Sequence, residues 1–280
     1  MTNLDALTRL VPPPPSPVAA DGDWAPIEAD LGLRLPTDFK ALTGRYGLGQ
    51  FVDFVSPLNP FSGQGQLQGA RRLLEGERRS REKYPEEHPY PYYPEPGGLL
   101  VWAGTDNGDR LCWLTEGEPD TWTTVLWNPR GWSYEPHPMG AVAFLYDWLS
   151  GNLGTELIAP PPAKPWFDPF VTRRYVTVCL ADPAATGPDY PERLRILRGA
   201  LAPTADRGAV DDGEDARQDH FAALALDWKL TYETAYGHQI RIAYPPADEE
   251  RARLTLLAAV ADMGCTVERV TTHAGAPAWE

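Results

Sequence analysis

The sequence is poor in the residues that build covalent frameworks and metal sites. Only 3 cysteines and 5 histidines occur among 280 residues. Cys112, Cys179 and Cys265 are odd in number and far apart, which argues against a disulfide framework and a zinc knuckle, so we expect buried, inert thiols. No histidine lies in a ligand spacing with a cysteine or another histidine. We therefore predict no metal and no cofactor, and only a metal site assembled in three dimensions stays open.

Long apolar runs and an excess of basic residues are missing as well. No window approaches the roughly 18 to 20 apolar residues of a membrane span, and the opening MTNLDALTRLVPPPP lacks the apolar region of a secretory signal. We expect a cytoplasmic protein without a membrane partner. The 25 Lys and Arg against 39 Asp and Glu give a formal net charge of −14. Because a phosphate backbone repels such a surface, we expect a basic protein partner and no direct nucleic-acid binding.

The usual catalytic signatures are also missing from the sequence. Gly-x-Ser-x-Gly, His-Glu-x-x-His and Gly-x-x-x-x-Gly-Lys do not occur. No residue pattern identifies a general base or a nucleophile with its orienting partner. We predict that the protein is not an enzyme, and an enzyme of unknown reaction is kept as an alternative.

The first half shows the helix and strand signals of an antiparallel sheet with flanking helices. Asp23 caps an apolar stripe that ends at Gly32, and Gly47 ends a second one, because glycine reaches positive φ without steric cost. Asn107-Gly108 separates two apolar runs, which is typical of a hairpin with a type I′ turn. The pattern predicts helices over 24–31, 36–46, 66–83 and 139–150, and strands over 50–55, 99–103, 111–114, 121–127 and 132–135. This half is therefore predicted to be an α+β meander.

A proline-rich segment at 160–165 divides the chain, as stiff linkers do at domain boundaries. We predict a first domain over residues 1–158, a linker over 159–166 and a smaller second domain over 167–280. The acidic stretch 202–219 is expected to be mobile. The second domain is expected to have strands and helices at 174–180, 190–201, 226–234, 238–244, 247–263 and 265–270. Their order, β-α-β-β-α-β, is that of the split βαβ, ferredoxin-like unit.

Acidic side chains gather in the predicted turns of the first sheet. From residue 106 to 120 there is one base, Arg110, and a rim of this charge would steer a cationic partner. Aromatic side chains supply many anchors of protein interfaces. The predicted partner-binding residues are Asp106, Asp109, Glu116, Glu118, Asp120, Trp122, Trp132, Tyr134, Tyr92 and Tyr93. The alternative for the acids is solubility alone, and Trp24, Trp102, Trp113 and Trp148 are expected in the core.

Part of the first half resembles a known family. The resemblance covers about residues 1–155. It is carried by Trp24-x-x-Ile27-Glu28-x-x-Leu31-Gly32-x-x-Leu35-Pro36-x-Asp38-Phe39-Lys40-x-Leu42, Tyr46-Gly47-x-Gly49 and Leu100-Val101-Trp102-Ala103-x-x-Asp106-Asn107-Gly108-Asp109. This pattern resembles the SUKH superfamily, which includes Smi/Knr-type cell-wall regulators and bacterial immunity proteins. The resemblance implies an α+β domain that binds protein, in many bacterial members a toxin, often a nuclease.

Three functions follow from these observations. The first is a non-catalytic immunity protein that occludes a basic toxin through an acidic, aromatic-containing surface. The second is a regulatory or scaffold protein whose C-terminal domain senses a small molecule. The third is an enzyme of unknown reaction, which requires a deep pocket with converging ionisable groups.

Overall fold

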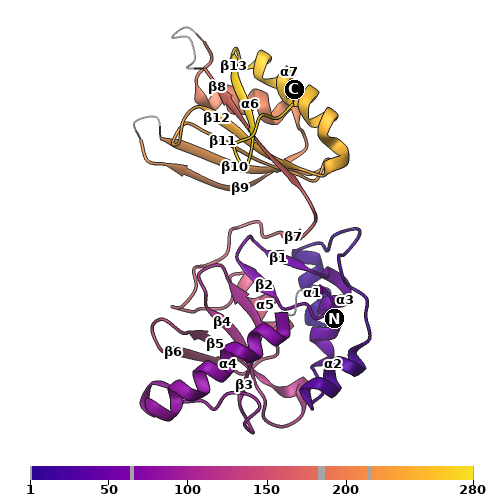
Figure 1. Cartoon of the computed structure of the whole chain (residues 1–280), viewed down its shortest axis with the longest axis vertical. Coiled ribbons are helices and arrows are strands. Elements are labelled where there is room, and N and C mark those ends of the chain that lie inside the picture. The colour runs from indigo at the N-terminus through magenta and orange to yellow at the C-terminus, as the bar shows by residue number, and fades with distance from the viewer. Residues whose placement is uncertain (1, 64–65, 182–186, 214–215, 280) are drawn as a thin grey trace. The chain divides into compact units, whose positions relative to one another are not determined.

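The chain folds into two compact units in a computed structural model (Figure 1). The structure describes residues 2–63, 66–181, 187–213 and 216–279, without the side chains of 66–68. The first unit spans Met1–Phe170 and the second spans Val171–Glu280. Each unit has its own hydrophobic core.

The first unit is built on an antiparallel sheet of seven strands. The strand order is β6-β5-β4-β3-β2-β1-β7. The strands are β1 (Gly49–Phe51), β2 (Val55–Pro57), β3 (Leu99–Thr105), β4 (Arg110–Leu114), β5 (Thr123–Asn128), β6 (Ser133–His137) and β7 (Phe167–Pro169). Strands β3 to β6 pair with their sequence neighbours, which confirms the predicted meander.

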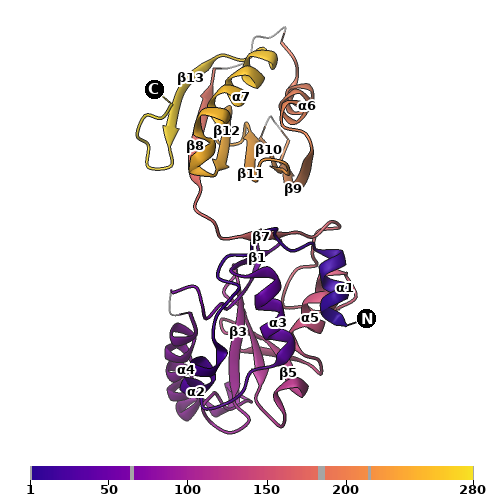
Figure 2. The same ribbon diagram turned by 90° about the vertical axis from the view of Figure 1, so that its right-hand side faces the viewer.

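Helices cover both faces of this sheet (Figure 2). They are α1 (Asn3–Leu10), α2 (Trp24–Leu31), α3 (Thr37–Tyr46), α4 (Gln66–Lys83) and α5 (Ala141–Leu149), with short 3-10 turns at Pro85–Glu87 and Pro119–Thr121. Phe39 of α3 packs edge-on against Trp113 at 4.8 Å between ring centroids, and Phe144 of α5 packs against Trp102. Leu74 of α4 is buried in the same core. The sheet therefore lies between helices, with α4 on one face and α5 on the other (Figure 2).

The helix ends agree with the sequence signals, whereas two turns do not. Asp23 accepts a hydrogen bond from the Ala25 backbone N–H at 2.9 Å, and Gly32 ends α2 in the left-handed conformation. The predicted strand 50–55 is a hairpin, because Val52 and Asp53 have positive φ and reverse the chain between β1 and β2.

The β3–β4 connection is a hairpin, as predicted, but not with a two-residue type I′ turn. Within Thr105–Asp109 only Gly108 has positive φ. The Thr105 hydroxyl accepts a hydrogen bond from the Asp109 N–H at 3.0 Å and lies 3.0 Å from the Asp109 carboxylate. These side-chain hydrogen bonds close a wider loop, which the Asn-Gly pair alone does not predict.

The first unit extends further along the chain than the sequence suggested. Strand β7 pairs with β1 through Phe51 and Phe167, so residues 167–170 belong to the first unit. The segment 159–166, expected to be a stiff linker between the domains, is hydrogen-bonded to the first unit at both ends. The Trp148 indole donates to the carbonyl of Ala159 at 3.1 Å, and the Val52 N–H donates to the carbonyl of Trp166 at 3.0 Å.

The second unit is an antiparallel sheet of six strands with two helices on one face (Figure 2). The elements are β8 (Arg174–Leu180), α6 (Tyr190–Ala200), β9 (Thr204–Asp211), β10 (Arg217–Ala223), β11 (Trp228–Glu233), β12 (Gln239–Tyr244), a 3-10 turn at Pro246–Asp248, α7 (Glu249–Asp262) and β13 (Val267–Thr272). In the order β13-β8-β12-β11-β10-β9, the first four strands have the ferredoxin-like arrangement that the sequence predicts.

The second unit differs from the predicted ferredoxin-like unit by the additional hairpin of β9 and β10. Stretch 202–219, expected to be mobile, contains β9 and the first residues of β10. Acidic residues and glycines are typical of loops, so the sequence did not indicate strands here. The backbone of β9 nevertheless pairs with β10, and β9 is an edge strand, where charged side chains are tolerated. The second unit is therefore a ferredoxin-like core with an added hairpin.

Gly47 provides a test of the first unit's packing. It has φ 68° and ψ −148°, and a Cβ there would lie 2.2 Å from the carbonyl oxygen of Val18. We expect Gly47→Ala to lower the free energy of unfolding of this unit by about 1–3 kcal/mol because strain and the clash add. The matched change Gly44→Ala, inside α3 with open space around it, should raise stability by up to about 1 kcal/mol. Denaturant unfolding checks both, and equal effects would contradict the prediction.

Candidate functional site

The five predicted acidic residues do not form one rim. Asp106 and Asp109 lie in the turn between β3 and β4, whereas Glu116, Glu118 and Asp120 lie between β4 and β5. Successive turns of an antiparallel meander lie at opposite ends of the strands. Five residues of β4, about 16 Å of strand, separate the two groups. The sequence prediction of a single acidic rim is therefore wrong.

Several of these acids have structural partners. The Asp120 carboxylate accepts from the Thr37 N–H at 2.6 Å, at the N-terminus of α3. Glu118 pairs with Arg34 at 3.1 Å, where both side chains are exposed. Asp106 is exposed and accepts from the Gln50 side chain. Glu116 is also exposed, so Asp106, Glu116, Glu118 and Asp120 remain accessible.

Asp109 is the exception among the acids, since it is only 1% exposed. Its carboxylate contacts the Thr105 hydroxyl at 3.0 Å, and one oxygen lies 3.7 Å from the Arg130 guanidinium. A side chain in this position supports the hairpin and does not reach a partner.

Three of the predicted aromatic anchors belong to the core. Tyr92, Tyr93 and Trp122 are buried. The Tyr93 hydroxyl donates to the Leu31 carbonyl, and the Trp122 ring lies 5.9 Å from that of Trp113. Tyr92 and Tyr93 lie between Pro91 and Pro94 in an irregular segment, yet the Tyr92 ring packs against Trp127 of the sheet at 5.5 Å between centroids. The core prediction holds for Trp102, Trp113 and Trp148, and Trp24 packs at the core's edge.

Trp132 is the one predicted anchor that is both large and exposed, with 39% of its surface accessible. It follows the β5–β6 turn and has φ 51°, a left-handed conformation that is uncommon for a bulky residue. Its ring packs edge-on against His88 at 4.6 Å between centroids. Such local strain is often found at binding sites, where the surrounding structure holds it.

A chain of polar side chains, in which His88 and Tyr92 are buried and Ser80 and Tyr134 partly exposed, holds His88 beneath Trp132. The imidazole Nδ1 is 2.6 Å from the Tyr92 hydroxyl, and Nε2 is 3.1 Å from the Ser80 hydroxyl on α4. The Tyr92 hydroxyl is also 2.6 Å from that of Tyr134, whose ring stacks on Trp127. This set, Ser80, His88, Tyr92 and Tyr134, is called the polar chain below. It positions the His88 ring, against which the exposed Trp132 ring packs.

Acidic residues lie at this end of the sheet, together with Arg130, two residues before Trp132, and Arg81, which donates to the His88 carbonyl at 3.3 Å. Glu86 and Glu87 precede His88 in the short 3-10 turn, and Asp106 lies in the turn at the same end. Burial lowers the pKa of His88, while Glu87 and Glu86 act in the opposite direction. The imidazole is therefore mostly neutral near pH 7. Trp132, Glu86 and Glu87 are called the Trp132 patch.

Sequence reasoning missed Glu86, Glu87 and His88. The segment 84–98 lies between the predicted helix 66–83 and the predicted strand 99–103, and its contact with Trp132 joins positions far apart in the chain. The available signal was the adjacent acidic pair beside a tyrosine-rich stretch.

In the parts of the chain that the structure describes, no group of three or more His, Cys, Asp or Glu side chains could hold a metal ion. Among the described helices none is long and apolar enough to cross a membrane. Cys112 and Cys179 are buried and Cys265 is partly so, and burial raises the pKa of the Cys112 thiol.

Asp109 gives a prediction that separates a structural role from a binding role. We expect Asp109→Ala to lower the free energy of unfolding by about 1–3 kcal/mol, because it leaves the buried Thr105 hydroxyl and its loop without their carboxylate. Glu116→Ala, an exposed acid at the opposite end, should change stability by less than about 0.5 kcal/mol. Thermal and denaturant unfolding measure both, and a neutral Asp109→Ala would refute the structural role.

His88 gives a pH-dependent prediction. Its folded-state pKa lies below the ordinary value of about 6.5, so the neutral imidazole stabilises the fold above that value and this contribution is lost as the pH falls. The stability difference between the natural chain and His88→Gln should therefore shrink from pH 7.5 to pH 5.5. Chemical unfolding at each pH gives the difference, and a constant value would contradict the assignment.

A comparison with known families finds a match within the first unit. Residues 21–145 match the family described as SMI1-KNR4 cell-wall, a SUKH family. The matched range runs from just before α2 into α5 and includes the meander, the polar chain and Trp132. No curated protein matches the chain. The fold and this match agree with the resemblance seen in the sequence, and the N-terminal unit of the chain belongs to the SUKH superfamily.

Proposed function

We propose that this chain is a cytoplasmic, non-catalytic immunity protein that neutralises a basic protein toxin, such as a nuclease, by occluding it. Membership of the SUKH superfamily and the formal net charge of −14 support a role in binding a cationic protein. The observation that carries the proposal is Trp132, an exposed ring that packs against His88, which directly follows Glu86 and Glu87 in the chain.

The Trp132 patch has the features of a binding hot spot. Tryptophan is enriched among residues that dominate binding energy, and acids around it complement a cationic partner. The His88 ring and the polar chain hold Trp132 in place, so little conformational freedom is lost on binding. A standard interface of about 1,600 Å² in total would extend from this patch over the neighbouring turns.

The charges near Trp132 also give a physical reason for occlusion. A nuclease binds phosphates through a cationic surface, so an acidic inhibitor can compete for that surface. Glu86 lies exposed and Glu87 half-buried in the turn before His88, and Asp106 lies exposed at the same end of the sheet. Association driven by such charges becomes slower as salt rises.

The test measures binding to the purified product of an adjacent toxin gene. We expect Trp132→Gly to weaken the affinity at least about 30-fold, because it removes a hot-spot ring. Glycine suits the left-handed backbone at this position, so the fold should be retained. The matched control is Tyr236→Ala in the second unit, where a 78% exposed ring is removed. If the Trp132→Gly variant bound the toxin with the affinity of the natural chain, Trp132 would not be the anchor of the interface.

A second pair of variants tests the contribution of the acidic side chains to association. Replacing Glu86 and Glu87 by glutamine should lower the association rate and flatten its salt dependence. The matched pair Glu116→Gln and Glu118→Gln removes the same charge from the opposite end of the sheet and should change the rate less. Equal effects of the two pairs would show that overall charge, and not this patch, governs association.

A further inference from the structure

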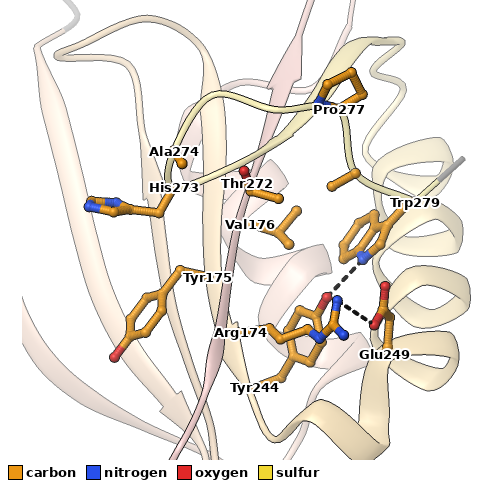
Figure 3. A pocket seen from close by; sticks show the side chains of 11 residues that line it. Arg174, Tyr175, Val176, Tyr244, Glu249, Thr272, His273, Ala274, Pro277 and Trp279 are labelled. Atoms are coloured by element: carbon orange, nitrogen blue, oxygen red, sulfur yellow. Dashed lines mark hydrogen bonds and ion pairs between the residues drawn. The ribbon is translucent and has the colours of Figure 1, made fainter.

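The second unit contains a cavity of about 490 Å³ beside the start of β8 (Figure 3). Its walls come from β8, the end of β12, the first residue of α7, the end of β13 and the segment 273–279 that follows it. A volume of this size is in the range of small-molecule sites, which are about 300–1,000 Å³. The cavity lies in residues that the SUKH match does not include.

The inner wall is apolar and well held. Val176 and Tyr244 are buried, and Ala278 and Trp279 pack against the same core. The Trp279 indole N–H donates to the Tyr244 hydroxyl at 2.9 Å, which anchors the chain segment that closes the cavity. Trp279 has φ 59°, and this hydrogen bond helps to hold the unfavourable backbone.

A pair of opposite charges lies at the edge of this apolar wall. Arg174 Nη1 is 3.0 Å from Glu249 Oε2, and both side chains are partly exposed. In Figure 3, Arg174, Glu249, Tyr244 and Trp279 are grouped on one side of β8, whereas Tyr175 and His273 point to the other side. An exposed ion pair contributes little to stability, so a ligand can replace each partner at low cost.

We infer that this cavity binds a small zwitterion, a free α-amino acid with an apolar side chain. The ligand's carboxylate would pair with Arg174 and its ammonium group with Glu249, while its side chain lies against Val176 and Trp279. Both charges of the protein then keep a partner. A ligand with one charge would pair with only one of these two side chains and would make one charge-assisted hydrogen bond fewer.

The test uses the full chain and calorimetric titration with L-phenylalanine, L-leucine, L-isoleucine, L-valine, L-methionine and L-tryptophan. We expect at least one of them to bind with a millimolar or lower dissociation constant. The single-charge analogues of the ligand, such as 3-phenylpropanoate and 2-phenylethylamine for phenylalanine, should bind at least about ten-fold more weakly, since each lacks one charge-assisted hydrogen bond. The indole N–H resonance of Trp279, assigned with Trp279→Phe, should shift on binding.

Matched variants place the ligand in the cavity. Arg174→Gln and Glu249→Gln should each weaken binding at least about ten-fold. Glu250→Gln is the control, because Glu250 is the next residue of α7, pairs with Arg253 at 2.8 Å and does not line the cavity. The inference is overturned if none of the six amino acids binds at 10 mM, if an analogue binds equally well, or if Glu250→Gln weakens binding as much as Glu249→Gln.

Discussion

The short contact between His88 and the Tyr92 hydroxyl is the interaction on which the proposed binding surface depends. It holds a buried imidazole under the sheet's edge, and that imidazole in turn supports Trp132. Ser80 joins the same polar chain from α4, so helix, loop and strand meet at one point. Because the polar groups satisfy one another, the structure can bury them and still expose the ring above.

Local features of this fold could be predicted from the sequence. Asp23 and Gly32 mark the ends of α2, and the apolar runs around Asn107-Gly108 mark two paired strands. These signals act over a few residues, through capping hydrogen bonds and the backbone freedom of glycine. The ferredoxin-like order was also predictable, because each of its elements has its own periodicity, but the hairpin of β9 and β10 was not.

The candidate site could be predicted only in part, because it depends on contacts between distant segments. Asp109 and Glu116 look alike in the sequence, yet one is buried at one end of β4 and the other is exposed at the opposite end. Trp132 was identified as an aromatic anchor, whereas its support by His88 joins positions 44 residues apart. Strand pairing decides which turns meet, and composition carries no such information.

The most direct test of the account is hydrogen–deuterium exchange of the full chain with and without its basic partner. If the Trp132 patch is the binding surface, amides in 84–90 and 128–134 become protected in the complex, while those in 115–121, at the other end of the sheet, keep their exchange rates. Protection confined to 115–121, or to the second unit, would contradict the account.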